Sequence, residues 1–73
     1  MEKYIVRGGG WYVGIYNTRT KRYSWKNKND LDELKRTEVY LLTKEQADGL
    51  IYKNSVSFMK MAGVTMEKVN EGK

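Results

Sequence analysis

The chain has 73 residues, no Cys, no His and a formal net charge of +5 at pH 7. A chain of this length builds one small domain with a thin core, so we treat residues 1–73 as a single domain. Without Cys or His it can form no disulfide framework, thiolate nucleophile, imidazole base or ordinary zinc site. An enzyme would have to use Asp, Glu, Lys or Tyr as general acid and base, and nothing in the sequence places such residues as a pair, so we expect a non-enzymatic protein without metal or cofactor.

Residues 3–26 predict three consecutive antiparallel strands. Tyr, Ile and Val favour a first strand over residues 3–7. The glycines at 8–10 permit the positive φ angles of a tight turn. A phosphate-binding loop would require a following Gly-Lys-Ser or Gly-Lys-Thr and a helix. Instead, a second strand is predicted over residues 11–17 and a third over residues 22–26.

The turn over residues 17–21 decides which side chains of this meander share a face, because a slip of one residue reverses all of them. An odd-length loop places the odd-numbered residues of the second strand beside Tyr23 and Trp25. An even-length loop places the even-numbered residues there and sets Trp25 over the bare backbone of Gly14. The Asn that begins this turn and the Thr three residues later favour a four-residue loop and the even register.

The middle of the chain predicts a short helical turn and a further strand. Asn29 or Asp30 can cap the helical turn, which continues through Leu34. Its acidic residues lack the spacing of a calcium loop, so we interpret them as capping and solvated groups. Residues 38–42 predict the fourth strand.

The main helix is predicted over residues 44–62. Thr43 followed by Gln46 indicates a capping box, and Gly63 suits the C-terminal cap. Apolar residues that include Leu50 and Phe58 follow one helical stripe, which we expect to pack in the core.

Residues 64–69 predict a last edge strand, and residues 70–73 a frayed tail. The predicted fold is therefore α+β. It has an antiparallel sheet, made of the N-terminal three-stranded meander plus one or two later strands, with the main C-terminal helix packed on one face.

Positive charge and aromatic rings are concentrated in the first part of the chain. Residues 1–28 contain seven basic residues and one acidic residue, whereas the remainder is close to neutral. Such a field attracts phosphates or an acidic protein surface. One helix covers one sheet face, so we expect aromatic surface to remain for a partner or for a second copy in a homodimer. The candidate ligand-binding residues are the cations and rings of the meander: Arg7, Trp11, Tyr12, Tyr16, Arg19, Lys21, Arg22, Trp25 and Lys26.

Several segments together resemble a known group of proteins. The opening strand KYIV, the aromatic hairpin, the short acidic segment and the run LLTKEQA at residues 41–47 are similar to very small accessory proteins of phages and prophages of Gram-positive bacteria. The resemblance covers most of the chain in outline. It implies a protein of early-region, host-takeover or anti-defence type, which blocks a host enzyme or defence system by binding it, or sequesters a nucleotide signal. It supplies no catalytic residue.

Two functions stay open. An inhibitor or modulator would bind a bacterial host or defence protein that has an acidic or nucleic-acid-binding surface. A single-stranded nucleic-acid or nucleotide binder would stack rings on bases and neutralise phosphates with cations. The resemblance favours the inhibitor, and the chain has neither a ribonucleoprotein-type motif nor helix-turn-helix spacing.

We expect a cytoplasmic location, in the host cytoplasm if the protein is phage-encoded, and no membrane partner. No apolar run reaches the roughly 18 residues of a membrane span. The first residues, Met-Glu-Lys-Tyr, lack the apolar core of a signal peptide.

Overall fold

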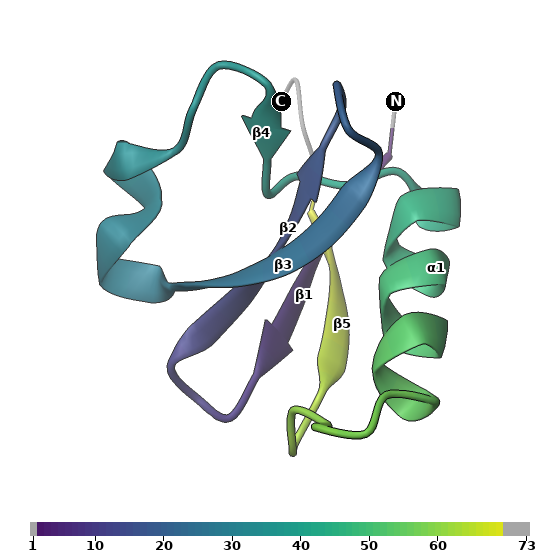
Figure 1. The fold of residues 1–73 in the computed structure, drawn as a ribbon. Helices are drawn as coiled ribbons and strands as arrows, with labels where there is room; N and C mark the ends of the chain where they lie inside the picture. Colours follow the sequence, from purple (N-terminus) through teal and green to yellow (C-terminus); the bar gives the residue numbers. More distant parts are fainter. Residues whose placement is uncertain (1, 70–73) are drawn as a thin grey trace.

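The computed structural model describes residues 2–69, which form a five-stranded antiparallel sheet and one main α-helix (Figure 1). The elements in chain order are β1 (Lys3–Gly8), β2 (Tyr12–Asn17), β3 (Arg22–Asn27), the 3-10 helix η1 (Lys28–Glu33), β4 (Glu38–Val39), α1 (Lys44–Ser55) and β5 (Thr65–Val69). The strand order is β3-β2-β1-β5, and β4 pairs with β2. This architecture confirms the α+β class, the N-terminal meander and two later strands. The tail predicted over residues 70–73 lies outside the described residues.

β1 and β2 diverge beyond the glycine turn, and the chain around β4 fills the space between them. Val39 of β4 pairs with Tyr16 of β2. Leu42 instead bridges to Tyr4 of β1, with backbone N···O distances of 2.7 and 2.8 Å. The strand predicted over residues 38–42 is therefore broken by a bend after Val39, because its two ends pair with different neighbours.

The β2–β3 turn has the four-residue form. The Asn17 side chain accepts hydrogen bonds from the backbone amides of Arg19 (2.9 Å) and Thr20 (3.0 Å). Lys21 closes the turn in the left-handed region, with a φ of 59°. Asn side chains bond in this way to the backbone two and three residues ahead, which stabilises a turn of this length.

The resulting register confirms the even-loop prediction. Tyr16 pairs with Tyr23, and Gly14 pairs with Trp25. Since side chains alternate along a strand, Tyr23 and Trp25 share a face with the even-numbered residues of β2.

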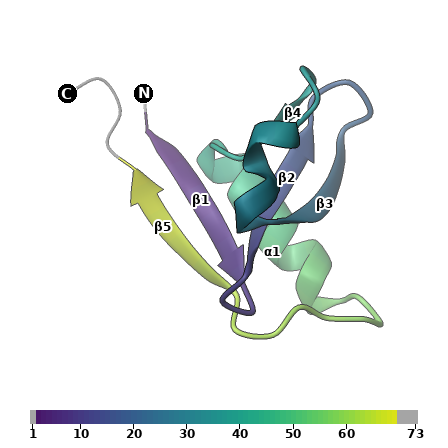
Figure 2. The ribbon, with the colours of Figure 1, turned by 90° about the vertical axis from the view of Figure 1, so that its left-hand side faces the viewer.

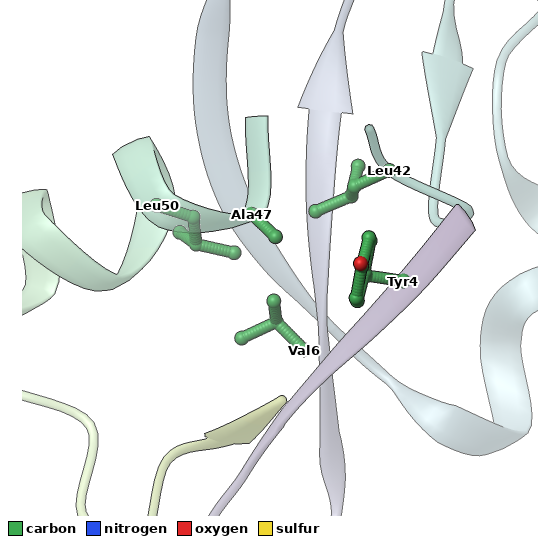
Figure 3. Packing of buried hydrophobic residues seen from close by; sticks show 5 residues of the cluster. All are labelled: Tyr4, Val6, Leu42, Ala47 and Leu50. Carbon is green, nitrogen blue, oxygen red and sulfur yellow. The ribbon is translucent and has the colours of Figure 1, made fainter. Parts of the chain in front are cut away.

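The hydrophobic core lies between this face and α1. Its buried members come from β1, the segment after β4 and α1: Tyr4, Val6, Leu42, Ala47 and Leu50 (Figure 3). Gly14 belongs to the same face, and a Cβ atom at this position would overlap the Leu50 Cδ2 atom. Because Gly14 has no side chain, Leu50 of α1 can pack directly against the backbone of β2.

The other face of the sheet is covered by η1. Val13 and Ile15 alternate with Gly14 and point away from α1, yet both are buried. Figure 2 shows η1 in front of the sheet and α1 behind it. The short 3-10 helix therefore closes a second, smaller apolar layer.

η1 begins earlier than predicted. Asn27 is its N-cap, and its side-chain oxygen accepts from the Asn29 amide at 2.9 Å. The prediction of Asn29 or Asp30 as the cap is wrong, because the Asn that ends β3 already supplies the capping oxygen.

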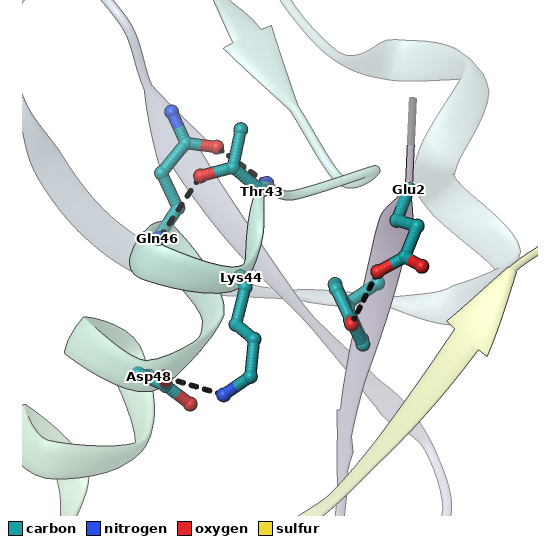
Figure 4. Close-up of polar contacts among 6 residues, drawn as sticks. Glu2, Thr43, Lys44, Gln46 and Asp48 are labelled. Carbon is teal, nitrogen blue, oxygen red and sulfur yellow. Dashed lines mark hydrogen bonds and ion pairs between the residues drawn. The ribbon is translucent and has the colours of Figure 1, made fainter.

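α1 begins at the predicted capping box (Figure 4). The Gln46 amide donates to Thr43 Oγ1 at 3.1 Å, and the Thr43 amide donates to Gln46 Oε1 at 3.0 Å. One turn further on, Lys44 Nζ lies 3.0 Å from Asp48 Oδ2.

We expect Thr43→Ala to lower the free energy of unfolding by about 1 kcal/mol, because the Gln46 amide would lose its side-chain acceptor. Thr43→Ser keeps the hydroxyl and should retain most of that stability. Urea denaturation of the two variants measures the difference. Equal losses in both would contradict a capping role for the hydroxyl.

α1 ends at Ser55, seven residues before the predicted end. The Asn54 side chain donates to the Met61 carbonyl (3.1 Å) and accepts from the Met61 amide (2.7 Å), so it holds the following chain in a loop. Such side-chain amides compete with the backbone bonds that continue a helix. Phe58, predicted to lie in the core, is 99% exposed. The predicted helix and its Gly63 cap are therefore wrong beyond Ser55.

Candidate functional site

The aromatic side chains of β3 face α1 and are partly buried against the hydrophobic core. Tyr16, Tyr23 and Trp25 pack against the buried cluster. The ring centroids of Tyr16 and Tyr23 are 5.0 Å apart. The Tyr23 hydroxyl reaches the helix at Gly49, where an added Cβ atom would lie 2.5 Å from it. Burial raises the pKa of Tyr23, and the neighbouring Tyr16 raises it further, so the hydroxyl stays neutral at physiological pH.

An open groove of about 390 Å³ lies between β3 and the C-terminal half of α1. We call it the β3 groove. Its walls include Tyr23 and Trp25 of β3, Leu50 and Lys53 of α1, and Val56 and Met59 of the segment after α1. The groove therefore has a mainly apolar lining with a cation on its helical wall.

β3 is an edge strand, and among residues 2–69 it pairs with β2 alone. Bonded and non-bonded residue pairs alternate along an antiparallel ladder. The Lys28 amide donates to the Trp11 carbonyl at 2.7 Å, and these two residues continue the register of the β2–β3 pairs. Because every second pair is hydrogen-bonded, the even-numbered residues of β3 bond to β2. The amide and carbonyl groups of Tyr23 and Trp25 consequently point to the open edge, beside the β3 groove.

The segment that closes the groove exposes an unusual amount of apolar surface. Phe58 is 99% exposed and Met59 is 82% exposed. With Tyr52 and Val56 they account for four of the seven exposed large hydrophobic residues of the described chain. We call these four residues the loop patch. Adjacent exposed apolar side chains of this kind mark interaction surfaces more often than single ones do.

The two chain segments that flank the groove carry positive charge only. Residues 17–28 contain five basic residues, residues 49–61 contain two, and neither segment contains Asp or Glu. By alternation, Arg22 and Lys26 lie on the face of β3 that points away from α1. A ligand along this edge would therefore meet apolar groups on one side and cations on the other.

The predicted cationic site residues lie in two separate places in the structure. Arg19 and Lys21 are exposed in the β2–β3 turn, next to Arg22 and Lys26 on β3. Arg7 lies apart from them on β1, two strands from β3, with its Nε 3.2 Å from Glu67 Oε1 of β5.

The predicted aromatic site residues also separate. Tyr16 and Trp25 are half-buried on the α1 side, and Trp25 lines the β3 groove. Trp11 is 59% exposed and Tyr12 is 40% exposed, both at the end of the hairpin opposite the β2–β3 turn. The Lys28 ammonium lies 5.2 Å from the centroid of the Trp11 ring.

Sequence reasoning misses the helical wall of the groove and the loop patch. It assigns residues 56–62 to the helix and Phe58 to the core. The Asn54-Ser55 interruption of the apolar stripe is the available signal, because an Asn near a helix end can turn the chain.

The chain was compared with protein-family models, curated proteins and solved structures, and none of them matches it. Across residues 2–69, no three metal-binding side chains gather into a group that could hold an ion. The one α-helix of this part of the chain is too short and too polar to cross a membrane.

Proposed function

We propose that this protein is a non-enzymatic binding protein, which inhibits or modulates a partner protein held against the β3 groove and the loop patch. The observation that carries the proposal is the exposure of two adjacent residues, Phe58 and Met59, the second of which lines an apolar groove. Covering such side chains with a partner removes apolar area from water, and aromatic and Met residues are common anchors at interfaces.

The charge distribution supports a partner with an acidic surface. The two chain segments that flank the groove contain seven basic residues and no acidic one, and Lys53 lines the groove itself. Cations around an apolar centre steer association and disfavour basic partners. The resemblance to small phage accessory proteins points in the same direction, toward a host or defence protein in the bacterial cytoplasm.

Single-stranded nucleic-acid binding finds less support. Stacking requires exposed ring faces, whereas Tyr16, Tyr23 and Trp25 are packed against the core. The exposed ring of Trp11 lies one strand length from the cations of the β2–β3 turn, about 20 Å for a strand of this size. Residues 2–69 therefore offer no compact platform that combines exposed rings with the basic turn.

Replacing both Phe58 and Met59 with Ser tests the proposed surface. We expect at least a tenfold loss of captured partner, equivalent to about 1.4 kcal/mol, in affinity capture from a nuclease-treated bacterial lysate followed by mass spectrometry. Both side chains are exposed, so the thermal unfolding midpoint should change little.

Trp11→Ser is the matched control for this experiment, because it removes an exposed aromatic ring that does not line the groove. It should leave capture unchanged. A partner that is retained by the Phe58 and Met59 variant, or is lost equally in the control, contradicts the proposed surface. Strong, salt-sensitive quenching of Trp fluorescence by a single-stranded oligonucleotide would favour the nucleic-acid function instead.

A further inference from the structure

We propose that the β3 groove accepts an extended, acidic segment of the partner as an added β-strand along the open edge of β3. This inference rests on the proposed function and specifies the mode of recognition. Strand addition uses the main-chain groups of a sheet edge for affinity and side-chain pockets for specificity.

The backbone requirement is met at the centre of β3. The amide and carbonyl groups of Tyr23 and Trp25 point outward, and the groove lies beside them. Ser24 also lines the groove, although its side chain lies on the opposite face of β3. The backbone edge of β3 therefore forms this side of the groove.

The two faces of the edge specify the side chains of the incoming segment. Residues that lie beside Tyr23 and Trp25 would enter the groove toward Leu50 and Met59, so they should be apolar. Residues beside Arg22 and Lys26 would lie on the outer face, where opposite charges across strands are favourable. The segment should therefore read acidic–apolar–any–apolar–acidic, with the central position opposite Ser24.

A second copy of this chain does not fit the same edge. In the antiparallel register centred on Ser24, Arg22 of each copy would lie opposite Lys26 of the other, and like charges across a ladder are destabilising.

β5 lies at the opposite end of the β3-β2-β1-β5 order and, among residues 2–69, pairs with β1 alone. Glu67 lies 3.2 Å from Arg7, and Lys68 lies 2.9 Å from Glu2, so charged side chains line that edge. The charges on β5 are thus already paired, whereas Arg22 and Lys26 of β3 form no ion pair among residues 2–69 and can pair with an incoming acidic residue. Of these two edges, β3 is the one that borders the groove.

A library of short synthetic peptides with the acidic–apolar–any–apolar–acidic pattern tests the inference. We expect the full-length protein to enrich peptides from this library over a matched library with Lys in place of the acidic residues. The best peptide is then added to labelled protein, and amide hydrogen exchange is followed by NMR. The amides of Tyr23 and Trp25 should exchange at least about tenfold more slowly, whereas those of Arg22 and Ser24, already protected by β2, should change little.

N-methylation of the peptide provides the second readout. Methyl groups on the alternate amides that face β3 should abolish binding, and methyl groups on the other alternate set should leave it intact, because an added strand donates with every second amide. Equal effects of the two sets, or binding without protection of Tyr23 and Trp25, would overturn strand addition and leave the proposed function standing. No enrichment of the acidic library also overturns the inference. The proposed function fails separately, through unchanged capture by the Phe58 and Met59 variant.

Discussion

Leu50→Ala is expected to lower the free energy of unfolding by about 2 to 5 kcal/mol. Leu50 is 2% exposed, belongs to the buried cluster and rests on the bare backbone of Gly14. Truncation would remove its apolar contacts and leave a cavity between α1 and β2. Because small domains have a modest total stability, this loss can take the protein close to unfolding at room temperature.

Phe58→Ala is the matched control for this prediction. The apolar pattern of the sequence places Leu50 and Phe58 on one helical stripe, but Phe58 is 99% exposed, so its truncation should change stability by less than about 0.5 kcal/mol. Urea denaturation of both variants, followed by Trp fluorescence, measures the contrast. Losses of similar size would contradict the end of α1 at Ser55.

Gly14→Val is expected to lower the free energy of unfolding by about 1 to 3 kcal/mol, and its cause is overpacking rather than a cavity. A Cβ atom at Gly14 overlaps Leu50 Cδ2 and lies 3.4 Å from Val6 Cβ. The β-branched side chain would therefore force α1 away from β2. Thermal unfolding of the variant measures the loss of stability, and an unchanged midpoint would show that the helix does not lie this close to the strand.

A double-mutant cycle isolates the contact between Gly14 and Leu50. Gly14→Ala adds one methyl group at the position that Leu50 fills, and Leu50→Ala empties that position. The combined variant should therefore be more stable than the sum of the two single effects predicts. Strict additivity would contradict the close approach of α1 to β2 at this point.

The two ends of α1 differ in how far their apolar side chains are buried. The capping box stabilises the first turn of the helix, and the buried side chains of Ala47 and Leu50 pack it against the sheet. The C-terminal end, from Tyr52 onward, leaves apolar side chains exposed beside the open edge of β3. The loss of helical structure after Ser55 thus creates the surface on which both proposals depend.

Local sequence determined much of this protein. It predicts the N-terminal strands, the glycine turn, the four-residue β2–β3 loop and the capping box of α1, because each depends on contacts within a few residues. Asn17 sets the loop through its own backbone neighbours, and Thr43 and Gln46 cap the helix reciprocally. The predicted site residues remain a prediction, since their placement alone does not identify a ligand.

Tertiary structure decided where the helix ends and which surfaces remain exposed. The bonds between Asn54 and Met61 span seven residues, and the break after Val39 arises because Tyr16 and Tyr4 lie on different strands. Helical periodicity alone could not separate buried Leu50 from exposed Phe58. That distinction depends on the end of α1 at Ser55, where Asn54 bonds to Met61 and turns the chain away from the helix, so Phe58 does not continue the helical stripe.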